Sequence, residues 1–457
     1  MAGVVILGAG LTGLSAAYHL DCSNIPYQIF EKSDRPGGLL KSVSECGYTF
    51  DHTGHYLHVS DDGFKHFLDH TIGIAAFNII QRRSAIFSHN VLTEYPFQMN
   101  LYGLPSDVIA DCIEGFVKRH TRIKDPQNFH RWVLKHFGAA IGKHFFFPYN
   151  RKLLSYDLKK VHPAWTGRFV PSTSLQSIVE GCLPYKQNTT AGYNSSFFYP
   201  KQGGIERIIA SIAKKITQPA HVNHEVVHID AQSRRIHFAN GASTTYTTLI
   251  STLPLNRLLG LLKEPAHTNV KQAQRHLLHN SVVNMNLGFD VPLHHDKHWI
   301  YFPEEIYPFY RLGFWHNVSA SLVPPGHSAV YGEFSYLPQH HSAGTLQRMI
   351  DEARSKTLAF LGVGSHHKTV EKILHLEHAY VIYDNWRQQN LQPLLDQLQT
   401  LNIHSIGRYG AWKYSSMQEA YQDGKAVAAV LEKTHTSSMQ VIQKGAQGGS
   451  RSAAFLP

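Results

Sequence analysis

The segment GVVILGAGLTG at residues 3–13 most constrains what this chain can fold into. An apolar run leads directly into Gly8, Gly10 and Gly13, which have the spacing G-x-G-x-x-G. Such a turn joins a buried strand to a helix: the first glycine allows the tight turn, the second lets backbone amides approach a pyrophosphate, and the third lets the helix pack closely. The helix N-terminus adds partial positive charge. The sequence therefore predicts a βαβ unit that binds a dinucleotide.

Two features after this turn bear on which dinucleotide is bound. The next apolar strand, PYQIFEK, ends in Glu31, whose carboxylate can accept hydrogen bonds from ribose hydroxyls and repels a 2′-phosphate. The stretch DRPGG follows, and Gly37 and Gly38 allow the chain to turn where a Cβ would clash with a cofactor. A Pro-Gly-Gly run also occurs in ordinary surface turns. The acidic residue argues against a 2′-phosphorylated dinucleotide, and the choice between FAD and NAD stays open at this point.

Length and charge narrow the class of protein. A chain of 457 residues is expected to form two or more lobes, each with its own core. The formal net charge of +10 favours an anionic ligand, but the basic residues are scattered, which argues against nucleic-acid binding. We find no apolar run long enough for a transmembrane helix and no export signal before the first strand. The four cysteines form no C-x-x-C pair, and a cytoplasmic location is expected.

The stretch DHTGHYLH at residues 51–58 carries several histidines. Imidazoles of His52, His55 and His58 could converge on a metal ion, but no nearby cysteine or carboxylate completes a ligand set. We therefore predict no metal site. A patch of a histidine-rich chain and a loop over a cofactor both stay open at this point.

Further motifs resemble the amine oxidase group of flavoproteins. DRPGG resembles the second flavin fingerprint of this group, and GRYGAWKY resembles the segment that closes the FAD site. The resemblance implies FAD as the cofactor, with Arg408 at the pyrophosphate or flavin and Met417 at the start of a helix that points at the isoalloxazine.

Within this group the chain resembles the UDP-galactopyranose mutase family over residues 3–431, through FDHTGHYLH, TEYPFQMNLYGLP, PYNRKLLSYDLKKVHPAWTGRFVP and FYRLGF. The resemblance implies an enzyme that interconverts pyranose and furanose forms of a nucleotide sugar, with UDP-hexose as substrate, through a sugar adduct at N5 of reduced flavin. His55 would lie beside the flavin, and Arg168 and Arg311 would clamp the diphosphate. The remaining substrate-binding residues that it implies are Tyr95, Phe97, Gln98, Asn150, Trp165, Tyr310, Tyr380 and Tyr414. NAD(P)H as the reductant and a homo-oligomer are left open.

The expected fold class is α/β, with a Rossmann-like FAD-binding domain interleaved with a substrate lobe made of a helical insert and an antiparallel sheet. The FAD-binding domain is expected at residues 1–75, 196–280 and 376–435, the helical insert at 76–195 and the sheet at 281–375. A flexible tail is expected at 436–457, because it is rich in Ser, Gly and Gln and has no sustained apolar face.

One segment departs from the family pattern. The family carries an acidic pair around a methionine, whereas this chain has Ser416 and Gln418 on either side of Met417. This departure admits a different nucleotide sugar or a different reaction. Two further alternatives stay open: an FAD-dependent oxidoreductase of the amine oxidase or protoporphyrinogen oxidase type, and a flavin-binding protein without catalysis.

Overall fold

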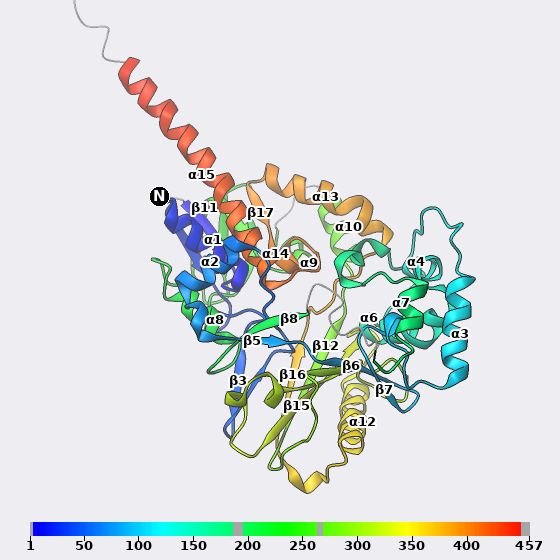
Figure 1. Ribbon diagram of the computed structural model, residues 1–457. Coiled ribbons are helices and arrows are strands. Elements are labelled where there is room, and N and C mark those ends of the chain that lie inside the picture. Colours follow the sequence, from blue (N-terminus) through cyan, green and yellow to red (C-terminus); the bar gives the residue numbers. More distant parts are fainter. Residues whose placement is uncertain (1–2, 186–194, 263–267, 449–457) are drawn as a thin grey trace, which may run out of the picture. The chain divides into compact units, whose positions relative to one another are not determined.

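The computed structural model describes residues 3–185, 195–262 and 268–448, which fold into two compact units (Figure 1). Unit 1 comprises Met1–Gly38, Ile209–Val270 and Leu395–Pro457, and unit 2 comprises Leu39–Ile208 and Lys271–Leu394. Each unit is assembled from segments that lie far apart in the sequence.

Unit 1 is built on a six-stranded sheet in the order β2-β1-β11-β10-β9, with β17 also paired to β11. The strands are β1 (Gly3–Leu7), β2 (Tyr27–Phe30), β9 (Val226–Asp230), β10 (Arg235–Phe238), β11 (Ser243–Ser251) and β17 (Ile403–Ser405). β1 pairs in parallel with β2 and β11, and β17 pairs in parallel with β11, whereas β9, β10 and β11 form an antiparallel ladder. The helix α1 (Leu11–Cys22) connects β1 to β2, which is the predicted βαβ unit.

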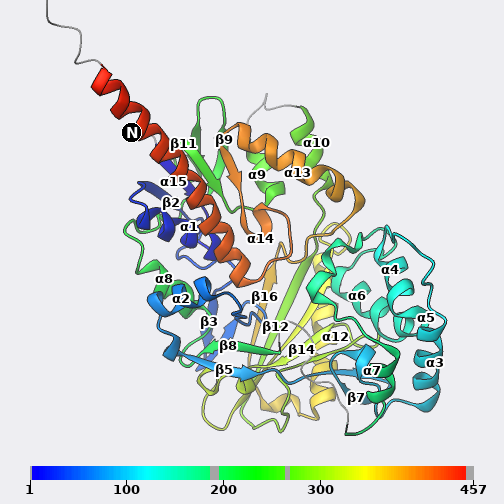
Figure 2. The same cartoon turned by 45° about the horizontal axis from the view of Figure 1, so that its top comes forward.

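The C-terminal helix α15 (Met417–Gly448) packs on α1 (Figure 2). The two helices approach closely at Gly424, where an added Cβ would lie 2.5 Å from the Thr12 carbonyl oxygen. Ser15 Oγ also donates to the Tyr421 carbonyl at 2.7 Å. The helix runs beyond residue 435, where the sequence predicts a flexible tail, because a helix that has already started can be extended by residues without an apolar face. Residues 449–457 of that tail lie outside the described residues.

Unit 2 is built on a seven-stranded sheet in the order β16-β12-β15-β14-β13-β6-β7. These strands are β6 (Ser84–Ser88), β7 (Val91–Glu94), β12 (Ser281–Phe289), β13 (Trp299–Tyr301), β14 (Arg311–Phe314), β15 (Ser328–Tyr336) and β16 (Lys368–Leu376). Neighbours are antiparallel except β13 and β6. Two short ladders accompany the sheet, β3 (Ser42–Glu45) with β4 (Tyr48–Asp51) and β5 (Phe77–Gln81) with β8 (Ser196–Pro200).

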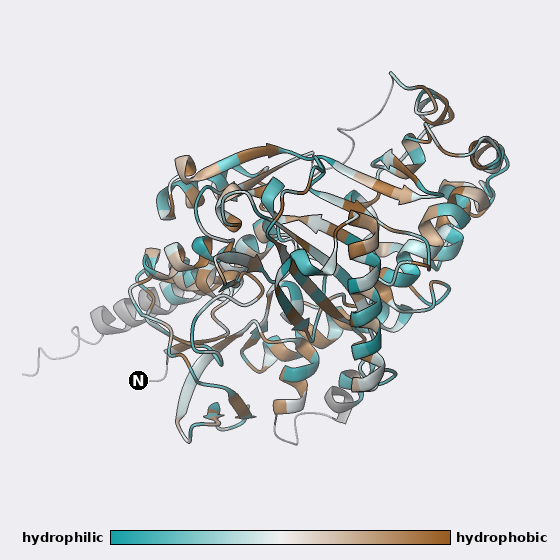
Figure 3. Ribbon diagram, turned by 90° about the horizontal axis from the view of Figure 1, so that it is seen from below, coloured by the Kyte–Doolittle hydropathy of each residue, from teal (hydrophilic) through white to brown (hydrophobic). Residues whose placement is uncertain are grey.

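The two faces of the seven-stranded sheet differ in chemistry, because successive side chains of a strand point to opposite faces. One face is apolar and is covered by α12 (Ala343–Leu361), whose Ile350 and Ala353 are buried against Leu312, Phe314 and strand neighbours. The opposite face carries the alternate residues of β14 and β15, and there Arg311 stands opposite Glu333 and Gly313 opposite Tyr331. Along the helices, hydrophilic and hydrophobic residues alternate, as expected where one side is buried (Figure 3).

The region that the sequence predicts as a helical insert, 76–195, is only partly helical. Its first part forms β5, β6 and β7; β6 and β7 lie at one end of the seven-stranded sheet, and β7 is its edge strand. Short runs that combine isoleucine with phenylalanine, such as FNII and SAIF, have the residue types that favour strands. The helices that follow are α3 (Ser106–Val117), α4 (Phe129–His136), α5 (Gly138–Ile141), α6 (Phe147–Leu154) and α7 (Leu175–Glu180). The unit boundaries at 38, 208, 270 and 394 also differ from the predicted ones, because β3, β4 and β8 pack within unit 2.

The remaining helices are α2 (Asp62–Thr71), α8 (Glu206–Ala213), α9 (Leu255–Leu261), α10 (Thr268–His276), α11 (Trp315–Val318), α13 (Asn385–Thr400) and α14 (Gly407–Gly410). Over residues 3–185, 195–262 and 268–448, we find no helix with the length and apolar character that crossing a bilayer requires.

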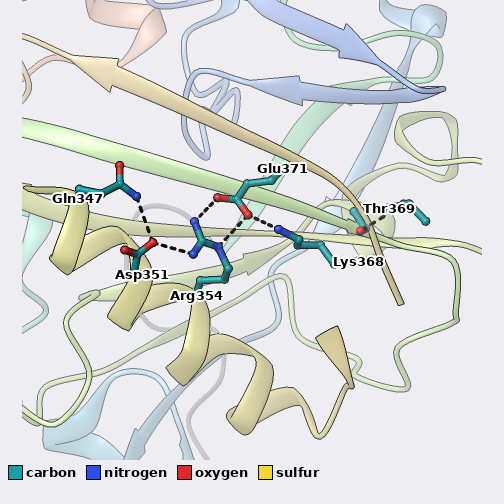
Figure 4. Close-up of polar contacts among 7 residues, drawn as sticks. Gln347, Asp351, Arg354, Lys368, Thr369 and Glu371 are labelled. Carbon is teal, nitrogen blue, oxygen red and sulfur yellow. Dashed lines mark hydrogen bonds and ion pairs between the residues drawn. The ribbon is translucent and has the colours of Figure 1, made fainter. Parts of the chain in front are cut away.

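A polar cluster ties α12 to β16 (Figure 4). Arg354 donates through Nε and Nη2 to the two carboxylate oxygens of Glu371, at 2.8 and 2.5 Å, and through Nη1 to Asp351 at 2.7 Å. Lys368 also contacts Glu371 at 2.5 Å. Because bidentate arginine–carboxylate bonds are strong and both partners are largely buried, this cluster holds the helix on the sheet.

We predict that Arg354→Met lowers the free energy of unfolding by about 1–2 kcal/mol, because it leaves the Glu371 carboxylate without its bidentate donor. Urea unfolding followed by circular dichroism measures this change. Arg348→Met is the matched control, since the exposed Arg348 donates to Thr345 of its own helix. Equal stability of the two variants would contradict the prediction.

Candidate functional site

The glycine-rich turn of unit 1 has the close packing that its sequence predicts. Gly8 has φ of +96°, and a Cβ on Gly13 would lie 2.0 Å from the Gly8 carbonyl oxygen. Gly38, at φ of +59°, packs against Gly10, with a Cβ position only 3.2 Å from the Gly10 Cα. Gly37 donates its amide to the Ala9 carbonyl at 3.0 Å. The two glycine motifs thus form one surface of bare backbone at the start of α1.

Glu31 is buried at the end of β2 and supports the same turn. Its Oε2 accepts a hydrogen bond from the Ala9 amide at 2.9 Å, and Oε1 accepts from the Ser33 amide at 3.0 Å. The carboxylate therefore lies beside the glycine-rich turn and fixes its backbone, in addition to the ribose contact that the sequence predicts.

The C-terminal motif adds Arg408 to unit 1. Gly407 packs on Thr12 at the start of α1, where an added Cβ would lie 2.8 Å from the Thr12 hydroxyl. Arg408 donates through Nη1 to the Ser415 carbonyl at 3.0 Å, and its guanidinium lies 5.6 Å from the centre of the Tyr414 ring. The fold therefore brings Arg408 and Tyr414 together on the segment that precedes α15.

The departure from the family pattern around Met417 has a structural role. The Ser416 amide donates to Glu419 at 2.7 Å, and the Glu419 amide donates back to the Ser416 hydroxyl at 3.3 Å. This reciprocal arrangement is a capping box, which satisfies free amides at the first turn of a helix. Ser416 and Glu419 thus cap the N-terminus of α15, which begins at Met417.

In unit 2, the stretch DHTGHYLH forms a loop after β4. Thr53 has φ of +97°, which is rare for a β-branched residue, and its carbonyl accepts from the His55 amide at 2.8 Å. The His55 ring lies 3.1 Å, through Nδ1, from the Thr53 hydroxyl. Among the residues that the structure describes, no group of three histidine, cysteine or acidic side chains could hold a metal ion.

Asp51 anchors the start of this loop. It is fully buried and accepts hydrogen bonds from the Tyr199 hydroxyl and the Ser42 hydroxyl, both at 2.6 Å, and from the Ile205 amide at 3.1 Å. Burial raises the pKa of Asp51 to about 6, against the opposing effect of these donors. Three segments of unit 2 therefore converge on the residue that precedes His52.

The polar face of the seven-stranded sheet carries a buried ion pair. Arg311 donates through Nε and Nη2 to Oε2 of Glu333, at 2.9 and 2.6 Å, and the Glu333 side chain is 0% exposed. Burial alone would lower the pKa of Arg311, but the Glu333 carboxylate raises it above its ordinary value. Oε1 of Glu333 accepts from the Gly54 amide of the His55 loop at 3.3 Å. Sequence reasoning found Arg311 but missed Glu333, which is recognisable only once the strand register is known.

Tyrosine side chains surround Arg311. Tyr310 and Tyr380 rings lie 6.4 Å apart, Tyr149 lies 6.4 Å from Tyr310 and 5.4 Å from Tyr301, and Tyr95 lies 5.4 Å from Tyr301. Burial raises the pKa of Tyr149 above its ordinary value, and the charge of Arg311 opposes that rise. The fold thus brings the predicted Tyr310 and Tyr380 to Arg311, and Tyr95 belongs to the same cluster through Tyr301. Tyr149 and Tyr301 belong to the same cluster and were missed, although Tyr149 stands beside Asn150 in the P-Y-N motif.

Four other predicted substrate residues make internal contacts. Asn150 Nδ2 donates to the Phe146 carbonyl at 2.8 Å, and Gln98 Nε2 donates to the Pro171 carbonyl at 2.7 Å. Phe97 stacks on Phe145 at 5.3 Å, and Trp165 lies 5.2 Å from the Phe129 ring. All four are buried.

Arg168 is exposed on a short 3₁₀ turn, Gly167–Phe169, in unit 2. Burial lowers the pKa of His58 below its ordinary value, and the charges of Arg82 and Arg168 lower it further. Arg168 therefore acts electrostatically on the end of the histidine loop, whereas Arg311 lies in the tyrosine cluster.

Comparison with known proteins agrees with this architecture. Residues 11–431 match the model of the flavin-containing amine oxidoreductase family. A crystal structure of reduced UDP-galactopyranose mutase is 26% identical, has a TM-score of 0.88, and the match covers 94% of this chain and 95% of that one. A putative protoporphyrinogen oxidase from Exiguobacterium sp. 255-15 is 14% identical, with a TM-score of 0.70 over 94% of this chain and 98% of that one.

Curated relatives match over shorter stretches. The 4,4′-diapolycopene oxygenase of Methylomonas sp. is 46% identical over 48 residues, which is 10% of this chain and 10% of that protein. Coproporphyrinogen III oxidase of Bacillus subtilis (strain 168) is 21% identical over 325 residues, covering 63% of this chain and 66% of the relative. The short matches carry no conclusion about the activity of the whole protein.

We predict that Gly13→Ala lowers the FAD content of the purified protein severalfold, because its Cβ would overlap the Gly8 carbonyl and push α1 away from the turn. The ratio of flavin absorbance to protein absorbance measures this loss. Gly3→Ala is the matched control, since a Cβ there would lie 3.5 Å from its nearest neighbour, the Pro26 carbonyl oxygen. Full flavin occupancy in Gly13→Ala would show that the turn tolerates a side chain.

Proposed function

The chain belongs to the family of flavin-containing amine oxidoreductases, and within it we propose a UDP-galactopyranose mutase-like enzyme that interconverts pyranose and furanose forms of a nucleotide sugar. The observation that carries this proposal is the buried Arg311–Glu333 pair inside a cluster of tyrosines on the polar face of unit 2. The similarity to a structure of reduced UDP-galactopyranose mutase over 94% of the chain supports it independently.

FAD is the cofactor of this chain, and the residues of unit 1 fit it. The bare backbone at Gly8, Gly10 and Gly38 allows a pyrophosphate to approach amides at the start of α1, whereas a Cβ at Gly13 would meet the Gly8 carbonyl and one at Gly38 the Gly10 Cα. When bound in its reduced form, the flavin supplies the nucleophile for the anomeric carbon of the sugar. The reaction then needs no side-chain nucleophile from the protein.

The task of unit 2 in this proposal is to hold the leaving group. A diphosphate that departs from the anomeric carbon must stay bound until the sugar has closed again through a different hydroxyl, because its loss would end the reaction. Arg311 offers a planar guanidinium for phosphate oxygens, and phenols such as Tyr310 and Tyr380 add neutral donors. Arg168 contributes a second, exposed cation on the same unit.

An FAD-dependent oxidoreductase of the amine oxidase or protoporphyrinogen oxidase type is the second candidate. It is favoured by the names of the curated relatives, which are oxidases and oxygenases. The polar face around Arg311 favours the mutase instead, because a charged pair and phenols suit a phosphorylated substrate better than an apolar one.

We predict that the protein reduced with dithionite converts UDP-galactofuranose to UDP-galactopyranose, whereas the oxidised protein does not. Anion-exchange chromatography of the nucleotide sugars measures the conversion. Arg311→Lys is expected to lower kcat/KM at least about 30-fold, because lysine cannot hold Glu333 through two nitrogens and present a further directed donor at the same time.

Arg354→Lys is the control for this substitution, since Arg354 also forms a bidentate pair with a glutamate in unit 2 but serves only to hold α12. It is expected to keep kcat/KM within about threefold of the unmodified protein. An FAD-replete, reduced protein that binds UDP and leaves the sugar unchanged would refute the mutase. Oxygen consumption that depends on an added amine would support the oxidoreductase.

A further inference from the structure

Glu333 is an unexpected residue beside an arginine that is proposed to bind a diphosphate. Its side chain is 0% exposed, and it stands directly opposite Arg311 in the β14–β15 register. A buried carboxylate at this place repels an anionic ligand of Arg311, because charges interact strongly where water is excluded. A site whose only task is to bind an anion tightly would not contain this buried carboxylate.

The ion pair determines what Arg311 can offer to a ligand. Nε and Nη2 both donate to Oε2 of Glu333, so Nη1 is the nitrogen of the guanidinium that lies outside the ion pair. The Arg311 side chain is 17% exposed. The arginine therefore presents a directed donor, while the net charge of the pair is close to zero.

The other oxygen of Glu333 holds the histidine loop. Oε1 accepts from the Gly54 amide at 3.3 Å, one residue before His55. Gly54 lies against Tyr331, where an added Cβ would be 2.2 Å from the Tyr331 hydroxyl. The hydroxyls of Tyr331 and Tyr56 share a hydrogen bond of 3.1 Å. One carboxylate thus contacts both the arginine and the loop, through a different oxygen for each.

We propose that Glu333 is a positioning residue that limits how tightly Arg311 holds the diphosphate of the nucleotide and, at the same time, fixes the His55 loop at Gly54. This inference rests on the proposed function, since it takes a nucleoside diphosphate as the ligand of Arg311. Weakened attraction allows the nucleotide product to leave after each turnover, while the directed donor still positions it during the reaction.

The test is Glu333→Gln, studied as the FAD-loaded full chain with UDP, uridine and inorganic pyrophosphate as ligands in calorimetric titrations. Removing the carboxylate charge is expected to tighten UDP and pyrophosphate about tenfold and to leave uridine unchanged, because only the first two carry the charge that Glu333 repels. In the proposed mutase reaction, KM should fall because the nucleotide binds more tightly. The value of kcat should also fall, because the product leaves more slowly and the Gln side chain cannot keep its bonds to both Arg311 and Gly54.

Glu371→Gln is the matched control, because Glu371 is also the bidentate partner of an arginine in unit 2, and all its affinities are expected to stay within about twofold. A purely structural role of Glu333 predicts equal weakening of UDP and uridine, and this result, or unchanged UDP affinity, would overturn the inference. If pyrophosphate tightens while neither protein binds UDP, the proposed function fails with its nucleotide substrate, and only the repulsion between Glu333 and a diphosphate anion at Arg311 stands. If neither protein binds UDP or pyrophosphate, both fail.

A second pair of variants tests the same inference if Glu333→Gln does not retain FAD. Arg311→Gln leaves the carboxylate facing the anion site, and Arg311→Gln/Glu333→Gln removes both charges together, which avoids a buried unpaired charge. The double variant is expected to bind pyrophosphate about tenfold more tightly than Arg311→Gln. Equal affinities of these two variants would overturn the inference.

Discussion

The structure of unit 2 depends on one buried ion pair between neighbouring strands. Arg311 and Glu333 stand opposite each other on β14 and β15, and their side chains lie on the face of the sheet that α12 does not cover. Removing one partner from such a pair leaves an uncompensated buried charge, which costs about 3–5 kcal/mol. The apolar packing beneath α12 provides the rigid sheet on which this costly arrangement can be held.

In unit 1 the main constraint is different: backbone segments of the cofactor-binding turn approach one another closely. Gly8, Gly13 and Gly38 each lie where a side chain would meet neighbouring main chain or a neighbouring hydroxyl. Glu31 then fixes the turn through the Ala9 amide, and the capping box of Ser416 and Glu419 starts α15, the helix that packs on α1. The contacts among Gly8, Gly10, Gly13, Glu31 and Gly38 and the capping box are each made within a short stretch of sequence, so this part of the cofactor-binding surface follows closely from short motifs.

This difference explains how much the sequence alone could predict. The βαβ unit and its glycine turn are determined by residues that are neighbours in the sequence, so the pattern of residues 3–38 was sufficient to predict them. Glu333 and Tyr301 become recognisable only through pairing between strands distant in sequence, as in the Arg311 register with Glu333. The helical insert was overestimated for the same reason, since β6 and β7 are short strands that gain stability from a sheet formed mainly by residues after 280.

Tyr331 has a further consequence for how this molecule can change. Its ring lies against both Gly54 and Gly313, where an added Cβ would meet ring atoms or the hydroxyl within 2.1–2.2 Å. A side chain at position 54 or 313 therefore fits only if the residue at position 331 is smaller than tyrosine. Divergent copies of the chain should exchange these three residues only in concert, and directed libraries that vary one of the three by itself will be depleted of folded members.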